Sequence, residues 1–211
     1  GGFAALYFSP RSRNMADRPP VRRTATKGED MPQTGQDEAA RVVRVAGGAL
    51  LGPFPGGGLA PDDRLPAGDG RLRHADRLTK LCLAGAGEAL ASAAVAPDDP
   101  RRASAGVYLG NAYGAYGANL AHHRTVVETG GRFASPAVFT YTLANVAAGW
   151  IAIRENLGGP CSIWASGLLA PAEALGAARR DLARGAAPFL LAGGAWASLP
   201  EGRAVLEGLR G

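Results

Sequence analysis

The stretch "GGPCSIWASGLLAPAEALGAARRDLARGAAPFLLAGGAWA", residues 158–197, decides the fold. After an opening Gly-Pro turn, the short apolar segment 161–166 predicts a strand. Residues 172–184 predict a helix, and residues 188–197 predict a buried strand. The helix is predicted from three apolar residues at helical spacing and from a glycine that ends it: Leu175, Ala178, Leu182 and Gly185. The whole stretch therefore reads as strand, helix, strand.

The same alternation continues towards the N-terminus. The predicted elements are, in order, a first strand from Arg41, an exposed Gly/Pro-rich loop at 52–72, a helix at 77–95 capped by Asp76, a strand at 105–111, a helix at 114–127 and a loop that opens a second helix near Asn145. A short helix is expected at the C-terminus. Strands that alternate with helices predict an α/β fold with a mostly parallel sheet.

Composition indicates one globular domain that follows an N-terminal segment of more polar composition. The chain has 211 residues, of which 46% are hydrophobic and 19% are charged, which is ordinary for a soluble domain. Residues 11–40 are polar and without periodicity, which predicts disorder. We expect residues 1–40 to be a disordered extension or the product of a misassigned start, and residues 41–211 to form the domain.

Charge and cysteine content exclude several classes of partner. The net charge is +5, but the arginines are spread along the chain and no groove-entering motif appears, so we expect no nucleic acid. No apolar run approaches the about 18–20 residues that span a membrane. Cys82 and Cys161 form neither a CxxC pair nor a metal-binding spacing, which predicts a reduced, cytoplasmic protein.

Four segments in order carry a family resemblance. They are "GVYLGNAYG" (106–114), "SPAVFTYTLANVAAGWIAIR" (135–154), "NLGGP" (156–160) and "ARRDLARGAAPFLLAGGAWA" (178–197). Together they resemble the amino-terminal half of a β-ketoacyl synthase over about residues 41–200. The resemblance implies half of a thiolase-like fold, with a layered, mostly parallel or mixed sheet and helices. It also implies descent from a 3-oxoacyl-[acyl-carrier-protein] synthase, an acyltransferase.

The position of the family's nucleophile decides whether this activity is retained. Such synthases form a thioester on a cysteine at the start of a buried helix, where the helix dipole favours the thiolate. Alignment without a gap from Pro160 to "LAGG" (191–194) places Leu168 at that position. A rival alignment of "ASG" (165–167) places Trp164 there. Neither alignment supplies a cysteine, and Cys161, seven residues before Leu168, is expected to pack as a small hydrophobe.

The family's two catalytic histidines come from its carboxy-terminal half, which we expect this chain to lack. His74, His122 and His123 match neither position. The resemblance therefore implies no catalytic residue, and nothing in the sequence implies a cofactor or a metal site. The chain thus resembles an acyltransferase without its nucleophile and histidines, and both an enzymatic and a non-catalytic role remain open.

The resemblance instead implies a non-catalytic partner of an active ketosynthase, similar to a chain-length factor. Such subunits serve fatty-acid, polyketide and aryl polyene-type pathways, and "FTYTLANV" (139–146) resembles the aryl polyene type. Acyl carrier protein, which is acidic, is implied as a further partner through the complex.

Five residues are candidates for the subunit interface or the acyl tunnel. By the resemblance, Ile163 and Trp164 lie on a strand near the dimer axis, and Phe139, Tyr141 and Thr142 lie on a loop that reaches towards the partner's tunnel. Buried aromatic residues often dominate such contacts. The alternative is that Trp164 and Phe139 fill the core of their own domain.

Two other functions remain open. Ser166 in "ASG" could be the nucleophile of a small acyltransferase or hydrolase, with His122 or His123 as the base, because serine catalysis needs a positioned base. The chain could also be a truncated fragment of a 3-oxoacyl-[acyl-carrier-protein] synthase.

Overall fold

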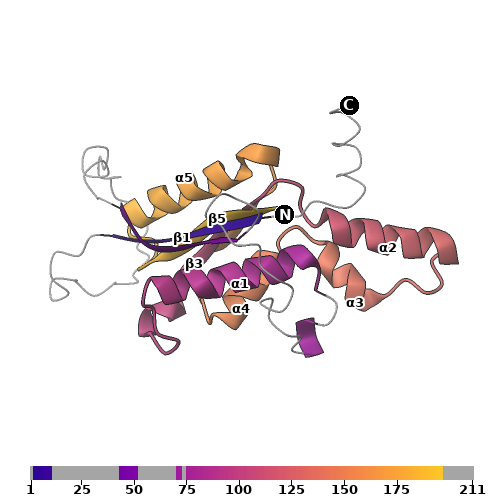
Figure 1. Ribbon diagram of the computed structural model, residues 1–211, viewed down its shortest axis with the longest axis horizontal. Helices are drawn as coiled ribbons and strands as arrows, with labels where there is room; N and C mark the ends of the chain where they lie inside the picture. Colours follow the sequence, from indigo (N-terminus) through magenta and orange to yellow (C-terminus); the bar gives the residue numbers. More distant parts are fainter. Residues whose placement is uncertain (1, 11–42, 52–69, 73–74, 197–211) are drawn as a thin grey trace, which may run out of the picture.

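The computed structural model describes residues 2–10, 43–51, 70–72 and 75–196, and its strands form one mixed sheet between helices (Figure 1). The strands are β1 (Gly2–Pro10), β2 (Val43–Leu51), β3 (Gly106–Asn111), β4 (Cys161–Trp164) and β5 (Leu190–Trp196). Their order across the sheet is β2-β1-β5-β3-β4. β3 is parallel to β4 and to β5, whereas β1 is antiparallel to both of its neighbours. The predicted α/β fold with a largely parallel sheet is confirmed.

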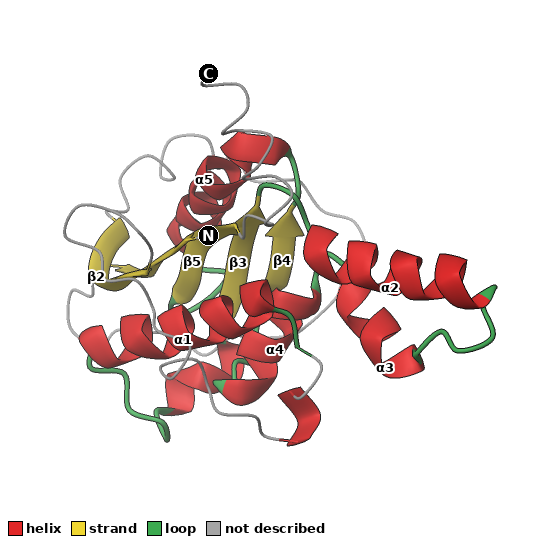
Figure 2. Cartoon of the chain, turned by 45° about the vertical axis from the view of Figure 1, so that its right-hand side comes forward, coloured by secondary structure: helices red, strands yellow, loops and turns green. Residues whose placement is uncertain are grey.

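The helices cover the two faces of the sheet unequally (Figure 2). α1 (Arg77–Ser92) and α4 (Val146–Arg154) lie on one face, and α5 (Ala170–Ala183) lies on the other. α2 (Tyr116–Thr129) and α3 (Pro136–Phe139) project from the side of β4. Four short 3-10 helices complete the described chain: η3 (Gly70–Leu72), η4 (Pro100–Ser104), η5 (Thr140–Thr142) and η6 (Gly167–Leu169).

Local sequence explains why α1 forms where it was predicted. The Asp76 carboxylate accepts a hydrogen bond from the Thr79 backbone N–H at 2.9 Å and so caps the first turn. The face predicted from helical spacing is buried in the core, at Leu78, Leu81, Cys82 and Leu90. α1 packs against β2, β1 and β5 and against α4, which in turn packs against β3 and β4.

The N-terminal strand is a difference from the sequence prediction. Residues 1–40 were expected to be an extension, but Gly2–Pro10 lies in the sheet as β1 and pairs with both β2 and β5. The segment shows no clean alternation of apolar and polar residues, so its pairing depends on strands far away in the sequence. Residues 11–42, for which disorder was predicted, lie outside the described residues, as do 52–69 and the C-terminal helix expected after 197. The proposed division of the chain near residue 40 remains a prediction.

The predicted loop before Asn145 contains two short helices. The Ser135 hydroxyl accepts a hydrogen bond from the Val138 N–H at 3.4 Å, and Pro136 occupies the first turn of α3, where proline is tolerated. These local signals were present in the sequence, but a helix of four residues is too short to show periodicity.

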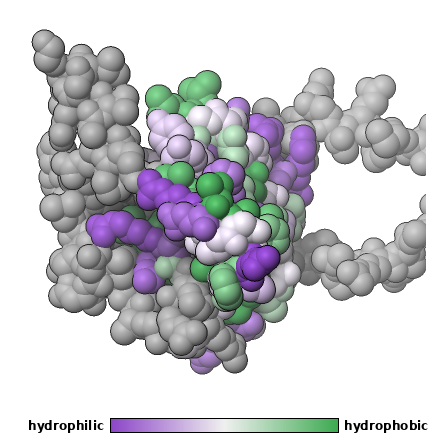
Figure 3. Space-filling view, turned by 90° about the vertical axis from the view of Figure 1, so that its right-hand side faces the viewer, coloured by the Kyte–Doolittle hydropathy of each residue, from purple (hydrophilic) through white to green (hydrophobic). Residues whose placement is uncertain are grey.

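α2 and α3 form a helical arm that stands apart from the sheet. Only Ala118 of α2 is buried. The Asn119 side chain donates a hydrogen bond to the Thr142 carbonyl at 2.8 Å, and the His122 ring packs against Phe139 with centroids 5.5 Å apart. Figure 3 looks onto this end of the molecule, where hydrophobic residues lie among hydrophilic ones. The arm is thus tied to itself and to η5 while much of its apolar surface stays exposed.

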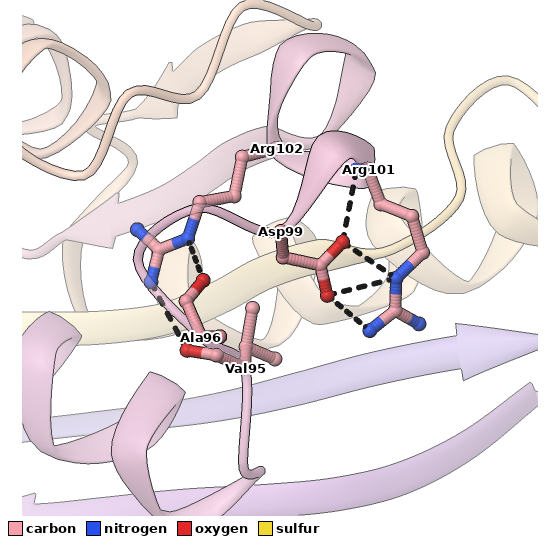
Figure 4. A network of polar contacts seen from close by, with 5 residues as sticks. All are labelled: Val95, Ala96, Asp99, Arg101 and Arg102. Atoms are coloured by element: carbon pink, nitrogen blue, oxygen red, sulfur yellow. Dashed lines mark hydrogen bonds and ion pairs between the residues drawn. The ribbon is translucent and has the colours of Figure 1, made fainter.

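A buried arginine joins the loop after α1 to the end of α4. The Arg102 guanidinium donates to the Ala96 carbonyl at 2.9 Å and to the Val95 carbonyl at 3.2 Å (Figure 4). It also donates to the Glu155 carbonyl at 2.6 Å and lies 3.1 Å from the Glu155 carboxylate. Next to it, Arg101 forms an exposed ion pair with Asp99, which lowers the pKa of that carboxyl group. Arg102 therefore joins two segments of the fold, whereas Arg101 contacts Asp99 at the surface.

Within the described residues, no single helix is long and apolar enough to cross a membrane. One pair of helical segments, Pro136–Thr142 and Val146–Arg154, passes this test only when the two are taken together, and they are bent by 98° at their break.

Candidate functional site

The candidate site is the turn between β4 and α5, at the carboxyl ends of the parallel strands. Ala165–Leu169 connects the end of β4 to the first residue of α5. The carboxyl ends of β3 and β5 lie at the same end of the sheet as that of β4, because the three strands are parallel. Loops at the carboxyl ends of parallel strands are the usual location of sites in α/β proteins.

Two glycines leave room for the start of α5 to lie directly against the sheet. A Cβ atom at Gly110 in β3 would overlap the backbone of Ala170 and Pro171, and one at Gly194 in β5 would overlap the Pro171 ring. α5 can therefore begin directly above these strands only because both positions lack a side chain. The turn is placed by this close approach, which the glycines of "YLGN" and "LAGG" make possible.

Leu168, the residue predicted at the nucleophile position, lies on this turn. Its side chain is 81% exposed, and the neighbouring Leu169 is also exposed. Gly167 precedes them with φ +75°, a left-handed conformation that glycine adopts without strain. No side chain caps the first turn of α5. The arrangement of strand, turn and helix is thus present around a residue that cannot form a thioester.

Ser166, the alternative nucleophile, lies on the same turn. Its hydroxyl donates a hydrogen bond to the Glu173 carboxylate in the first turn of α5. The expected base, His122, packs instead against Phe139 in the arm. The structure therefore brings Ser166 to a carboxylate that the sequence analysis did not consider.

Neither cysteine has the environment of an activated thiol. Cys82 is fully buried in α1, and burial raises the pKa of its thiol. Cys161 begins β4 and is exposed at the residue level, but desolvation of the thiol also raises its pKa. Both shifts favour the neutral thiol, which is the less nucleophilic form.

The structure separates the candidates on the loop by burial. Phe139 is 53% exposed at the end of α3. Tyr141, in contrast, is buried in the core and stacks on Trp150 of α4, with ring centroids 6.5 Å apart. The Thr142 hydroxyl donates to the Phe139 carbonyl at 2.7 Å. Tyr141 is therefore buried where the arm joins the core, whereas the Phe139 ring is exposed on the arm.

Ile163 and Trp164 lie on opposite faces of β4, which is an edge strand among the described ones. Ile163 is partly buried and packs on the α1 and α4 side of the sheet. Trp164 is partly buried on the α5 side, where its ring lies 5.3 Å from that of Tyr108. Both side chains thus pack within their own domain, on the strand that forms the edge of the described sheet.

A partly buried polar pair beside Trp164 was not predicted from the sequence. The Tyr108 hydroxyl, on β3, donates a hydrogen bond to the Asp181 carboxylate on α5. The two residues are 73 positions apart, and no local pattern links them. Burial, together with Asp181, raises the pKa of Tyr108 to about 12.

The Tyr108 phenol should therefore titrate late. Exposed tyrosines ionise near pH 10, whereas we expect Tyr108 to remain protonated at about pH 11. Because its folded pKa is raised, its contribution to stability is full below about pH 10 and is lost as the pH rises towards 12. Absorbance at 295 nm, compared between the wild type and Asp181→Ala, measures this. If the late part of the curve had the same midpoint in Asp181→Ala as in the wild type, the hydrogen bond between Tyr108 and Asp181 would be contradicted.

Among the described residues, no group of three or more His, Cys, Asp or Glu side chains is arranged to hold a metal ion.

Comparison with known proteins places these features in a family. Residues 57–207 match the family described as "Beta-ketoacyl synthase, N-terminal domain". The 3-oxoacyl-[acyl-carrier-protein] synthase 2 of Rhizobium meliloti (strain 1021) is 32% identical over 146 residues, which cover 62% of this chain and 35% of that protein. The chain thus spans about a third of the length of this relative.

Solved structures agree on the fold. A β-ketoacyl synthase from Burkholderia phymatum STM815 superposes with a TM-score of 0.60 at 22% identity, over 77% of this chain and 38% of that one. The ishigamide ketosynthase/chain length factor superposes with a TM-score of 0.60 at 26% identity, over 75% of this chain and 43% of that one. A type II polyketide synthase ketosynthase–acyl-carrier protein complex, AntDE:AntF, gives 0.62 at 20% identity, over 69% and 42%. Since the family match covers most of the chain, this protein belongs to the β-ketoacyl synthase family and corresponds to its N-terminal domain.

Proposed function

We propose that this chain is a non-catalytic, chain-length-factor-like subunit that pairs with an active ketosynthase. The observation that carries the proposal is the exposed Leu168 on the turn between β4 and α5, where the sequence alignment predicts the position of the family's nucleophilic cysteine. The likeness to a ketosynthase/chain length factor supports the same role. The pathway would be of the fatty-acid, polyketide or aryl polyene type, in the cytoplasm, with acyl carrier protein engaged through the complex.

The partner would contact the free edge of the sheet and the arm. Edge strands offer unpaired backbone groups to another chain, and β4 carries Trp164 there. Phe139 adds an exposed aromatic ring on α3. We propose that these residues, together with Ile163 and Thr142, line the contact, and that Tyr141 acts from the core by holding η5 in place.

Co-expression tests the proposal. The chain is tagged, the untagged ketosynthase encoded nearest to it is co-expressed, and the complex is purified through the tag. We expect the synthase to be retained in a fixed ratio and to make longer products than it makes alone. Retention of no synthase, with unchanged product length, would overturn the proposed function.

Phe139→Ala should weaken that complex by about tenfold or more, since aromatic residues at the centre of an interface can contribute 2 kcal/mol or more. The matched control is Val45→Ala, which removes exposed apolar surface from β2 at the opposite edge of the sheet. Affinity is measured by titration calorimetry. Equal losses for the two variants would show that Phe139 is not a specific contact.

Leu168→Cys should show that only the reactive side chain is missing from the turn. In a Cys161→Ala background, we expect its thiol to react with iodoacetamide about tenfold faster at pH 7 than that of Val127→Cys. Residue 168 precedes the uncapped N-terminus of α5, which favours a thiolate, whereas Val127 lies in the last turn of α2, where the helix dipole disfavours it. Equal rates would mean that the turn no longer activates a nucleophile.

A second candidate is an acyltransferase or hydrolase that uses Ser166, and the hydrogen bond from Ser166 to Glu173 favours it. In such a reaction the serine oxygen would attack an acyl thioester, the carboxylate would accept the hydroxyl proton, and the thiol would leave. Labelling with a fluorophosphonate probe tests it. An adduct on Ser166 that disappears in Glu173→Gln would bring this function forward, and an unlabelled protein would remove it.

A further inference from the structure

We propose that Tyr108 and Asp181 are positioning residues that hold Trp164 in the orientation in which it meets the partner subunit. This inference rests on the proposed function, because it assigns a role within the same partner-binding edge. Neither positioning residue would touch the partner itself.

The register of the sheet places Trp164 against Tyr108. Trp164 pairs with Gly110 of β3 across the parallel ladder, and Tyr108 lies two residues earlier on the same face of that strand. Since Gly110 has no side chain, the aromatic neighbour of Trp164 on β3 is Tyr108. Their ring centroids are 5.3 Å apart and their planes are inclined by 54°, a tilted packing that aromatic pairs favour.

Asp181 fixes the Tyr108 ring in turn. The Tyr108 hydroxyl donates to one carboxylate oxygen of Asp181, while the other oxygen lies 4.0 Å from the Arg184 guanidinium. Tyr108 is only 5% exposed and packs among alanines and leucines of α5 and β5. A buried ring that is held at its hydroxyl keeps its place beside Trp164 and so supports the tryptophan in this orientation.

The consequence for binding is a reduced entropic cost. Immobilising one side chain at an interface costs about 0.5–1.5 kcal/mol, and a side chain that is already held avoids most of that cost. Loss of the Tyr108 hydroxyl should therefore weaken partner binding by about twofold to tenfold. It should do so although Tyr108 is buried beneath the edge.

Fluorine NMR on protein labelled with 5-fluorotryptophan tests the inference in the free chain. The three tryptophan signals are assigned with single Trp→Phe variants. In Tyr108→Phe and Asp181→Ala we expect the Trp164 signal to shift or broaden, and the Trp150 and Trp196 signals to stay unchanged. Asp181→Asn should restore the signal, since its amide oxygen can still accept the Tyr108 hydrogen bond. The control is Arg184→Ala, which leaves that bond intact.

Affinity for the co-expressed ketosynthase gives the second readout, with circular dichroism to confirm that each variant is folded. An unchanged Trp164 signal and unchanged affinity in Tyr108→Phe would overturn the inference. Failure of the proposed function looks different, because the wild type itself would then retain no synthase. The fluorine signal of the free chain would still decide whether Tyr108 positions Trp164.

Discussion

Gly110→Ala is expected to destabilise the protein by about 3 kcal/mol, near the upper end of what overpacking costs. The new methyl group would overlap the backbone at the start of α5, where Ala170 and Pro171 cross β3. Backbone atoms cannot rotate aside as a long side chain can, so either the helix or the strand must shift. The free energy of unfolding, measured with urea, gives the size of the loss.

Gly149→Ala is the matched control, because it adds the same methyl group inside α4, where no atom beyond the neighbouring residues and the backbone of the same helix lies within 4 Å. A glycine in the middle of a helix costs about 0.5–1 kcal/mol relative to alanine, so this variant should be more stable than the wild type. The two glycine variants are thus expected to change stability in opposite directions. A Gly110→Ala variant as stable as the wild type would show that α5 does not begin against β3.

Arg102→Met is expected to cost about 3–5 kcal/mol, the usual effect of removing one partner from a buried ion pair. Methionine fills much of the same volume but donates no hydrogen bond. The Val95, Ala96 and Glu155 carbonyls would lose their donor, and the Glu155 carboxylate would lose its cation. The loop after α1 and the end of α4 would then separate.

Arg101→Met serves as the control beside it. Arg101 pairs with Asp99 at the surface, where ion pairs contribute about 0–1 kcal/mol. Thermal unfolding of both variants measures the difference. If the two lowered stability equally, the burial of Arg102 would have no energetic significance.

Periodicity and local signals predicted most of the fold. The cap at Asp76 and the buried face of α1 are confirmed, as are the strands near residues 43, 106, 161 and 190, because each depends on residues close in the sequence. β1 was not predicted, since what makes Gly2–Pro10 a strand is its pairing with β5, almost 190 positions away. The segment also lacks a clean alternation of apolar and polar residues, so no local pattern marked it as a strand.

The site could be predicted only as far as local spacing allowed. Spacing from Pro160 predicted Leu168 at the nucleophile position, which stays a prediction; the structure shows Leu168 on a turn between strand and helix. Burial could not be read from the same spacing, so Tyr141 was grouped with Phe139 although one lies in the core and the other is exposed. The Tyr108–Asp181 pair and the contact of Gly110 with α5 join distant segments, and they become visible only in three dimensions.

The place of β1 between β2 and β5 has a consequence for biosynthesis. β1 pairs on one side with β5, which lies at the other end of the described residues and is synthesised much later. Until β5 emerges, β1 and β2 can associate only as a two-stranded ribbon, which is marginally stable in water, and one backbone edge of β1 stays open to other chains. A nascent chain of this protein should therefore depend on chaperones while the residues between β2 and β5 are synthesised, and β1 should gain its second neighbour only once β5 has left the ribosome.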